Sequence, residues 1–234
     1  MLKRRIPVSK HSLFKYLPNT QRVDALLGGE IFCQSLRYFQ LIEDGQVRGD
    51  TKEGTSVFEP PIGLAINKLT NGESFILKDH RFESAANTDH IYAFCLGTSL
   101  NDQLAKEFKA VACVEILDIQ KFCTLATRNL APDFSLPTVD KKPRIGHRVR
   151  YYDPAEPPST RWALPELIAI SKRKCFSWQE EFRLVFGKRT VFDFMNAKYE
   201  LKTGETGTSQ LASTSPPVVI QIGNIESFSK VHCF

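Results

Sequence analysis

Short apolar runs of β-type sequence recur along the chain without regular alternation with helical segments, and this pattern most constrains the fold. Segments containing glycine, proline or asparagine separate many of the runs. Strands are predicted at residues 13–16, 30–33, 74–77, 90–96, 110–116, 149–152, 178–186 and 218–222. Short helices are predicted at residues 21–27, 35–42, 102–109 and 165–173. We therefore expect an α+β fold of mixed, mainly antiparallel sheets with a few short helices, rather than a doubly wound parallel sheet.

Length and composition fit one folded domain. The 234 residues are 42% hydrophobic and 24% charged, so there is enough apolar sequence for a sizeable core. No internal repeat is present. We expect a single domain over residues 1–234, with long polar loops at 43–59 and 203–217. Loops of that length in a compact domain often carry function.

The net charge, the apolar runs and the cysteines indicate where in the cell the protein acts and which partners it can have. The net charge of +5 is compatible with a nucleic acid or a phosphate-bearing ligand but does not require one. The basic start of the chain is not followed by an apolar signal segment, and no apolar run reaches the roughly 18 residues of a membrane span. The six cysteines form no Cys-x-x-Cys pair. These features predict a cytoplasmic protein with free thiols and no membrane partner.

The segment from Trp178 to Arg183 has the strongest chemical character. Glu181 stands near a predicted strand start, and Gln179 lies two residues earlier, so both side chains are expected on one face. A carboxylate there can hold a ribose hydroxyl and stabilise an oxocarbenium-like sugar carbon, and the Gln179 amide can hold an incoming nucleophile. The alternative is a surface strand with a Glu–Arg pair. We expect Glu181 to be an exposed pocket residue, whose replacement by alanine abolishes activity with little loss of stability.

Two further segments offer groups that can bind a nucleotide. On the first strand, Lys15 can bind a pyrophosphate and Tyr16 can stack on a base. The run at 90–96 is followed by Gly97, Thr98 and Ser99, which offer hydroxyls at a sheet edge. The alternatives are a solvated lysine and a local turn in which the hydroxyls bond nearby backbone.

The loop after residue 42 is a third candidate. It contains Arg48, Asp50 and Glu53 between glycines, and Arg37 and Tyr38 precede it. These side chains can bind a ligand or close over it, and the alternative is a plain polar loop. The five histidines form no zinc motif, and the chain has no P-loop, dinucleotide-binding glycine motif or nucleophile elbow.

Taken in order, these segments resemble an uncharacterised bacterial family with a late Trp-x-x-Glu-x-Glu-aromatic-Arg motif. The matching segments are Phe14 to Tyr16, Gly49 to Gly54, Tyr92 to Ser99 and Trp178 to Arg183, which are short but span most of the chain. That pattern in turn resembles the three-part signature of ADP-ribosyltransferase-fold toxins. Those enzymes carry an Arg or His on the first strand, a Ser-Thr-Ser-like strand, and Glu/Gln-x-Glu on a later strand.

The resemblance implies specific roles. Glu181 would grip the nicotinamide ribose and Gln179 would orient the acceptor, as the catalytic pair. The residues implied to bind NAD are Lys15, Tyr16, Arg37, Tyr38, Thr98 and Ser99. The residues implied to bind the acceptor substrate are Asp50, Glu53, Trp178 and Arg183. No metal site is implied. The chain departs from the family pattern at Lys15, which lacks the planar fork of arginine, and at Gly97 in place of the first serine.

The implied activity is transfer of ADP-ribose from NAD to a nucleic acid or protein acceptor by a toxin or defence enzyme, with an antitoxin as a possible partner. The basic stretches 141–150 and 172–174 suit a nucleic acid. Two alternatives remain. One is a catalytically inactive antitoxin or phage-sensing binding module of the same fold, which Lys15 and Gly97 favour. The other is a Mg²⁺-dependent nuclease using Asp50, Glu53 and Glu181.

Overall fold

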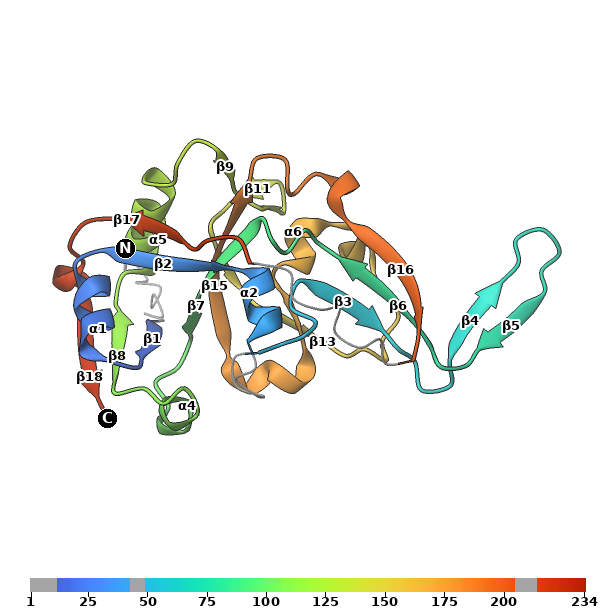
Figure 1. Ribbon diagram of the computed structural model, residues 1–234, viewed down its shortest axis with the longest axis horizontal. Coiled ribbons are helices and arrows are strands. Elements are labelled where there is room, and N and C mark those ends of the chain that lie inside the picture. Colours follow the sequence, from blue (N-terminus) through green and yellow to red (C-terminus); the bar gives the residue numbers. More distant parts are fainter. Residues whose placement is uncertain (1–11, 43–48, 205–213) are drawn as a thin grey trace, which may run out of the picture.

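A computed structural model describes residues 12–42, 49–204 and 214–234 (Figure 1). Arg48 and most of the 203–217 loop lie outside these ranges. The fold is mixed α+β with a few short helices, as the sequence predicts. Among the described strands, β13 and β14 form a parallel pair and the other pairs are antiparallel.

The elements have the following bounds. The strands are β1 Leu13–Leu17, β2 Glu30–Ser35, β3 Thr55–Phe58, β4 Leu64–Asn67, β5 Ser74–Leu77, β6 His80–Ala85, β7 Ile91–Gly97, β8 Ala112–Ile116, β9 Phe134–Ser135, β10 Thr138–Val139, β11 Lys142–Pro143, β12 Gly146–Arg148, β13 Arg150–Tyr152, β14 Ser171–Arg173, β15 Glu181–Lys188, β16 Lys198–Thr203, β17 Val218–Gln221 and β18 Ser229–Cys233. The α-helices are α1 Thr20–Leu27, α2 Leu36–Leu41, α4 Asp102–Glu107, α5 Ile119–Arg128 and α6 Pro165–Ile168. Short 3-10 helices are η1 Thr160–Ala163, η2 Lys174–Gln179, η3 Phe194–Asn196 and η4 Glu226–Phe228.

The largest sheet has the strand order β12-β15-β7-β1-β8-β18. On one side, β7 pairs with β15 along its whole length. On its other side, β7 pairs with β1 at Gly97 and with β2 at Ala93 and Tyr92. The sheet therefore splits beside the middle of β7, between β1 and β2. The carbonyl of Cys95 lies at this split and accepts a hydrogen bond from the Lys15 ammonium at 2.7 Å.

The two faces of β7 and β15 enter different cores, as the alternation of strand side chains requires. One face packs with α5 and contributes Phe94, Leu96, Leu184 and Phe186. The opposite face packs with α6 and contributes Ala93 and Val185. A three-stranded sheet, β16-β6-β3, lies beyond this second core, and the β4–β5 hairpin projects from it at the end of the molecule (Figure 1).

Two predicted elements are wrong in part. The loop predicted at 43–59 contains β3. The helix predicted at 165–173 ends at Ile168, and residues 171–173 instead form β14 beside β13. The strand sends neighbouring side chains to opposite sides, so Lys172 reaches Glu181 and Arg173 reaches Asp50. Both carboxylates are buried and need a cationic partner. An extended backbone at Lys172 and Arg173 lets each of these neighbouring cations reach one of the carboxylates. Among the described residues, no helix combines the length and apolar character needed to cross a membrane.

Candidate functional site

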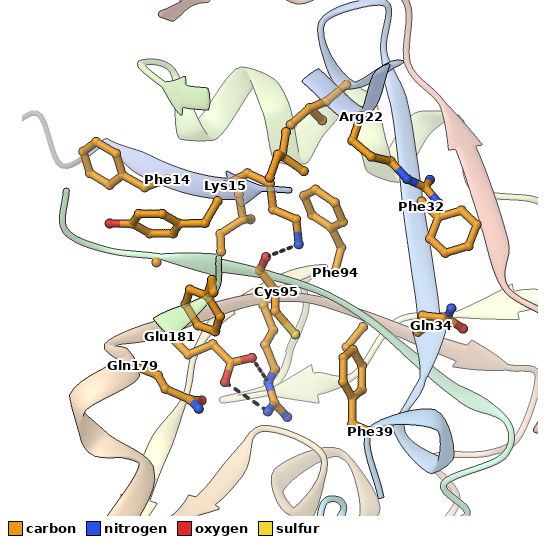
Figure 2. Close-up of a pocket in the computed structure, with 18 of the residues that line it drawn as sticks. Phe14, Lys15, Arg22, Phe32, Gln34, Phe39, Phe94, Cys95, Gln179 and Glu181 are labelled. Atoms are coloured by element: carbon orange, nitrogen blue, oxygen red, sulfur yellow. Dashed lines mark hydrogen bonds and ion pairs between the residues drawn. The ribbon is translucent and has the colours of Figure 1, made fainter. Parts of the chain in front are cut away.

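A cavity of about 340 Å³ lies at the split in the large sheet (Figure 2). Its volume falls within the range of about 300–1,000 Å³ typical of small-molecule sites. Phe94 and Leu96 line it from one face of β7, and Ala93, Cys95 and Gly97 line it from the other. The cavity therefore lies along the edge of β7 that is left unpaired between β1 and β2. Residues of β1, α1, β2, α2, β14 and β15 complete its walls.

Gln179 and Glu181 meet in this cavity, but not by the route expected from the sequence. The strand begins only at Glu181, Gln179 ends the 3-10 helix η2, and Glu180 between them has a left-handed backbone with φ of 43°. The prediction that both project from one strand face is therefore wrong. Their side chains converge instead on the Lys172 ammonium, which donates to Gln179 Oε1 at 2.8 Å and to Glu181 Oε2 at 3.2 Å.

Arg183 lies between two carboxylates at the base of the cavity. Its Nη1 and Nη2 donate to Glu53 Oε1 and Oε2 at 2.7 and 2.9 Å. Its Nε and Nη2 donate to Glu181 Oε1 and Oε2 at 2.6 and 3.2 Å. The Lys172 ammonium also lies 3.6 Å from Glu53 Oε2. Glu53, Lys172, Glu181 and Arg183, here called the ion cluster, thus balance two negative charges with two positive ones.

The ion cluster is almost completely withdrawn from solvent. The side chains of Arg183 and Glu53 are 1% exposed, that of Lys172 is 5% exposed and that of Glu181 is 7% exposed. The expectation that Glu181 is an exposed residue is therefore wrong, and the small loss of stability expected on its replacement no longer has a physical basis. Burial brings Glu181 into a low-dielectric site where its charge must be paired. Removing the carboxylate leaves part of the positive charge of Arg183 and Lys172 uncompensated.

The cluster also fixes the ionisation of its members. Burial alone raises the pKa of Glu181, but the charges of Arg183 and Lys172 outweigh it and hold the pKa well below the ordinary 4.5. For Lys172, burial lowers the pKa, and the charges of Glu181 and Glu53 outweigh it and raise the pKa above 10.5. The neighbouring thiol of Cys95, whose pKa burial raises to about 12, hydrogen-bonds the same carboxylate of Glu181. Glu181 is therefore an oriented carboxylate that stays ionised at neutral pH.

The stabilisation due to the Glu181 charge is expected to disappear in acid. The unfolded chain takes up a proton at Glu181 near pH 4.5, whereas the folded carboxylate stays ionised to lower pH. The unfolded state then binds more protons, so the contribution is complete above pH 4.5 and is lost as pH falls through the folded pKa. Urea unfolding should show a smaller stability difference between the wild-type chain and Glu181→Gln at about pH 3 than at about pH 7. Equal differences would contradict an ionised, charge-paired Glu181.

Five other predicted site residues line the cavity beside Gln179 and Glu181. They are Lys15, Tyr16, Tyr38, Glu53 and Arg183, of which the last two belong to the ion cluster. Tyr16 is well buried. Its hydroxyl donates to Ser99 O at 2.9 Å and accepts from Asn101 N at 2.8 Å, and burial raises its pKa to about 12. The Tyr16 side chain is thus held in one orientation at the cavity wall.

The remaining predicted residues do not line the cavity, as far as the described chain shows: Arg37, Asp50, Thr98, Ser99 and Trp178. Arg37 hydrogen-bonds Gln40 at 2.9 Å, and Asp50 accepts from Arg173 at 2.8 Å. The Thr98 backbone N–H donates to Glu180 O at 3.0 Å, which ties the end of β7 to the residue before β15. Trp178 is 38% exposed and stacks on Phe108, a cavity residue, with ring centroids 6.3 Å apart. Trp178 therefore contacts the cavity wall from outside.

Several residues of the site were missed. Lys172 and Cys95 contact Glu181, the Tyr151 hydroxyl accepts the Glu181 backbone N–H at 2.9 Å, and Arg22 lines the far end of the cavity. The only sequence signal for Lys172 was its place in the basic stretch 172–174, which suggested a solvent-facing or nucleic-acid-binding role. Its neighbour in the structure is instead a buried carboxylate.

The three carboxylates of the nuclease alternative do not form a metal centre. Asp50 pairs with Arg173, whereas Glu53 and Glu181 both pair with Arg183. Within the described ranges, no group of three or more His, Cys, Asp or Glu side chains is placed to hold a metal ion. The guanidinium of Arg183 thus occupies the position between Glu53 and Glu181 that a metal ion shared by the two carboxylates would need.

The cavity is lined by an ionised carboxylate, an amide, several aromatic rings and cationic side chains, a set suited to a polar ligand with planar rings. Comparison with protein-family models, curated proteins and solved structures finds no match to this chain.

Proposed function

We propose that this protein is an ADP-ribosyltransferase-like enzyme that cleaves NAD and transfers ADP-ribose to a protein or nucleic acid. One observation carries the proposal. Each of the three segments that resemble the transferase signature has a residue on one of three neighbouring strands, in the order β15-β7-β1. Lys15, Gly97 and Glu181, one residue from each segment, line the same cavity. Segments far apart in sequence thus contribute to one cavity, which supports the proposal.

The cavity offers what cleavage of a nicotinamide–ribose bond requires. The bond between ribose C1 and the nicotinamide nitrogen breaks, and its electron pair leaves with nicotinamide. Positive charge then develops on C1, where the ionised Glu181 can hold a ribose hydroxyl and stabilise that charge. The acceptor supplies the electron pair of the new bond to C1 and loses its proton to solvent. Arg183 and Lys172 keep Glu181 ionised and oriented.

Aromatic side chains supply stacking surfaces for the planar rings of the substrate. Those lining the cavity are Phe14, Tyr16, Phe32, Tyr38, Phe39, Phe94 and Phe108. A nicotinamide or adenine ring placed against them loses apolar surface to water and gains ring–ring contact. The amide of Gln179, held by Lys172, completes the polar end of the cavity.

One observation favours a second candidate, a catalytically inactive antitoxin or phage-sensing module of the same fold. Both oxygens of Glu181 accept hydrogen bonds from Arg183, and one also accepts from Lys172. Those cations reduce the negative charge that Glu181 can present to C1. A protein of this kind would bind a nucleotide without cleaving it.

The test is incubation of the purified chain with a cell lysate and with NAD that carries a label on its ADP-ribose part, without added metal. Glu181→Gln and Glu73→Gln serve as paired variants, because Glu73 lies in an exposed ion pair with Lys68 away from the cavity. Transfer of label by the wild-type chain and Glu73→Gln, but not by Glu181→Gln, supports the transferase and identifies the acceptor class. Equal labelling by all three chains, or none by any, contradicts it.

A further inference from the structure

Arg22 provides a cation at the end of the cavity opposite the ion cluster. It lies in the first turn of α1, lines the cavity, and its guanidinium carbon lies 4.6 Å from the centroid of the Phe32 ring on β2. Figure 2 shows Arg22 and Phe32 well separated from Gln179 and Glu181. Within the described part of the chain, no carboxylate forms an ion pair with Arg22.

Lys15, which the sequence suggested as the pyrophosphate ligand, has a different environment. Its ammonium donates to the Cys95 carbonyl at 2.7 Å and lies 4.2 Å from the centroid of the Phe94 ring. These contacts fasten β1 to β7 at the split, where the backbone pairing of β7 is interrupted. Moving Lys15 onto a phosphate would expose a strand carbonyl that needs a donor.

The surroundings of Arg22 suit an anion. Leu17 and Pro18, just before the Asn19 cap of α1, also line the cavity, so the positive end of the helix lies at the same wall. The solvent-exposed guanidinium of Arg22 lies against the Phe32 ring, a cation–π contact that favours this position of the side chain. Glu30 on β2 lines this wall as well and offers an acceptor for a ribose hydroxyl.

We propose that Arg22, rather than Lys15, is the phosphate-binding residue of the cavity, and that the ligand is a nucleotide carrying a diphosphate. This inference rests on the proposed function and identifies the residue that would anchor the substrate. A guanidinium offers a planar fork that matches two phosphate oxygens, which an ammonium cannot do. The diphosphate then lies at Arg22, and the sugar to be attacked lies toward Glu181.

Calorimetric titration with ADP-ribose, and separately with adenosine, tests the assignment on the wild-type chain and four variants. Arg22→Gln removes the charge, Arg22→Lys keeps the charge without the fork, and Lys15→Met removes the amine. Arg128→Gln, an exposed residue on α5, is the matched control. Arg22→Gln should weaken ADP-ribose binding about tenfold or more, as expected for a lost charge-assisted contact, and leave adenosine binding unchanged.

Arg22→Lys should recover only part of the affinity, and Lys15→Met should weaken both ligands together through disturbance of the cavity wall. No ADP-ribose binding by the wild-type chain, or equal affinity in Arg22→Gln, would overturn the inference. Loss of ADP-ribose binding alone in Lys15→Met would also overturn it. Arg22-dependent binding without nicotinamide release from NAD would support the inference and contradict the transferase. Nicotinamide release with an unchanged KM for NAD in Arg22→Gln would support the transferase and contradict the role of Arg22.

Discussion

Replacing Arg183 by methionine should lower the free energy of unfolding by about 3–5 kcal/mol, as breaking a buried charge network does. Arg183 is 1% exposed and donates to Glu53 and Glu181. Methionine fills most of the volume but leaves two buried carboxylates sharing only Lys172. Urea denaturation, read by far-ultraviolet circular dichroism, measures the change. The matched control Arg128→Met, on the exposed side of α5, should stay within about 0.5 kcal/mol of wild type.

A double variant separates charge from packing. Glu53→Gln combined with Arg183→Met leaves one carboxylate and one ammonium in the cluster, so it should recover part of the stability lost in Arg183→Met alone. Additive losses from the two substitutions, or a loss below about 1 kcal/mol for Arg183→Met, would show that the cluster is not a coupled buried network.

Glu181→Gln should slow NAD cleavage by at least about 100-fold, the scale of losing one transition-state electrostatic contact. The amide is nearly isosteric and one oxygen still accepts from Arg183 or Lys172, so the fold should survive with a smaller stability cost than in Arg183→Met. What disappears is the negative charge that would stabilise ribose C1 in the proposed reaction. Nicotinamide release under saturating NAD, at a temperature where urea curves show both chains folded, gives the comparison.

The affinity for ADP-ribose is the companion measurement that makes that result specific. Affinity for ADP-ribose should change far less than the rate in Glu181→Gln, because the charge acts on the developing C1 cation rather than on the bound ground state. A rate within tenfold of wild type, from a folded variant, would remove Glu181 from the catalytic role.

Much of the sheet was predictable from local pattern. The runs at 13–16, 30–33 and 110–116 are apolar and short, and each forms a strand with buried residues. The stretch at 171–173 gave no such signal, because its residues are serine, lysine and arginine. It became a strand because Lys172 and Arg173 each pair with a carboxylate on a different side, which only the tertiary fold reveals.

Helix α5 and strand β18 were missed for a related reason. In α5 only Phe122 and Ala126 are buried, so the apolar stripe is narrow. Strand β18 has the polar sequence of an edge strand, with no fully buried residue along Ser229–Cys233. Pairing with β8, which is apolar and central, places it in the sheet.

The sequence indicated a segment that lines the cavity, but it did not indicate the environment of the side chains in that segment. Glu181 and Arg183 share a strand face by simple alternation. The partner of Arg183 is Glu53, 130 residues earlier in the chain, and no local pattern announces that pairing. The relation of Gln179 to Glu181 depends on the left-handed backbone of Glu180, a conformation that is uncommon for a residue with a side chain. Burial of Glu181 follows from these long-range contacts.

The most direct test of the account is nicotinamide release from NAD by the purified wild-type chain, in the presence of a chelator that removes divalent metal. We expect release that the chelator leaves unchanged and that Glu181→Gln nearly abolishes. A folded wild-type chain that binds ADP-ribose yet releases no nicotinamide would contradict it and favour the inactive binding module. Activity that appears only with added divalent metal would contradict it as well, in favour of metal-dependent chemistry.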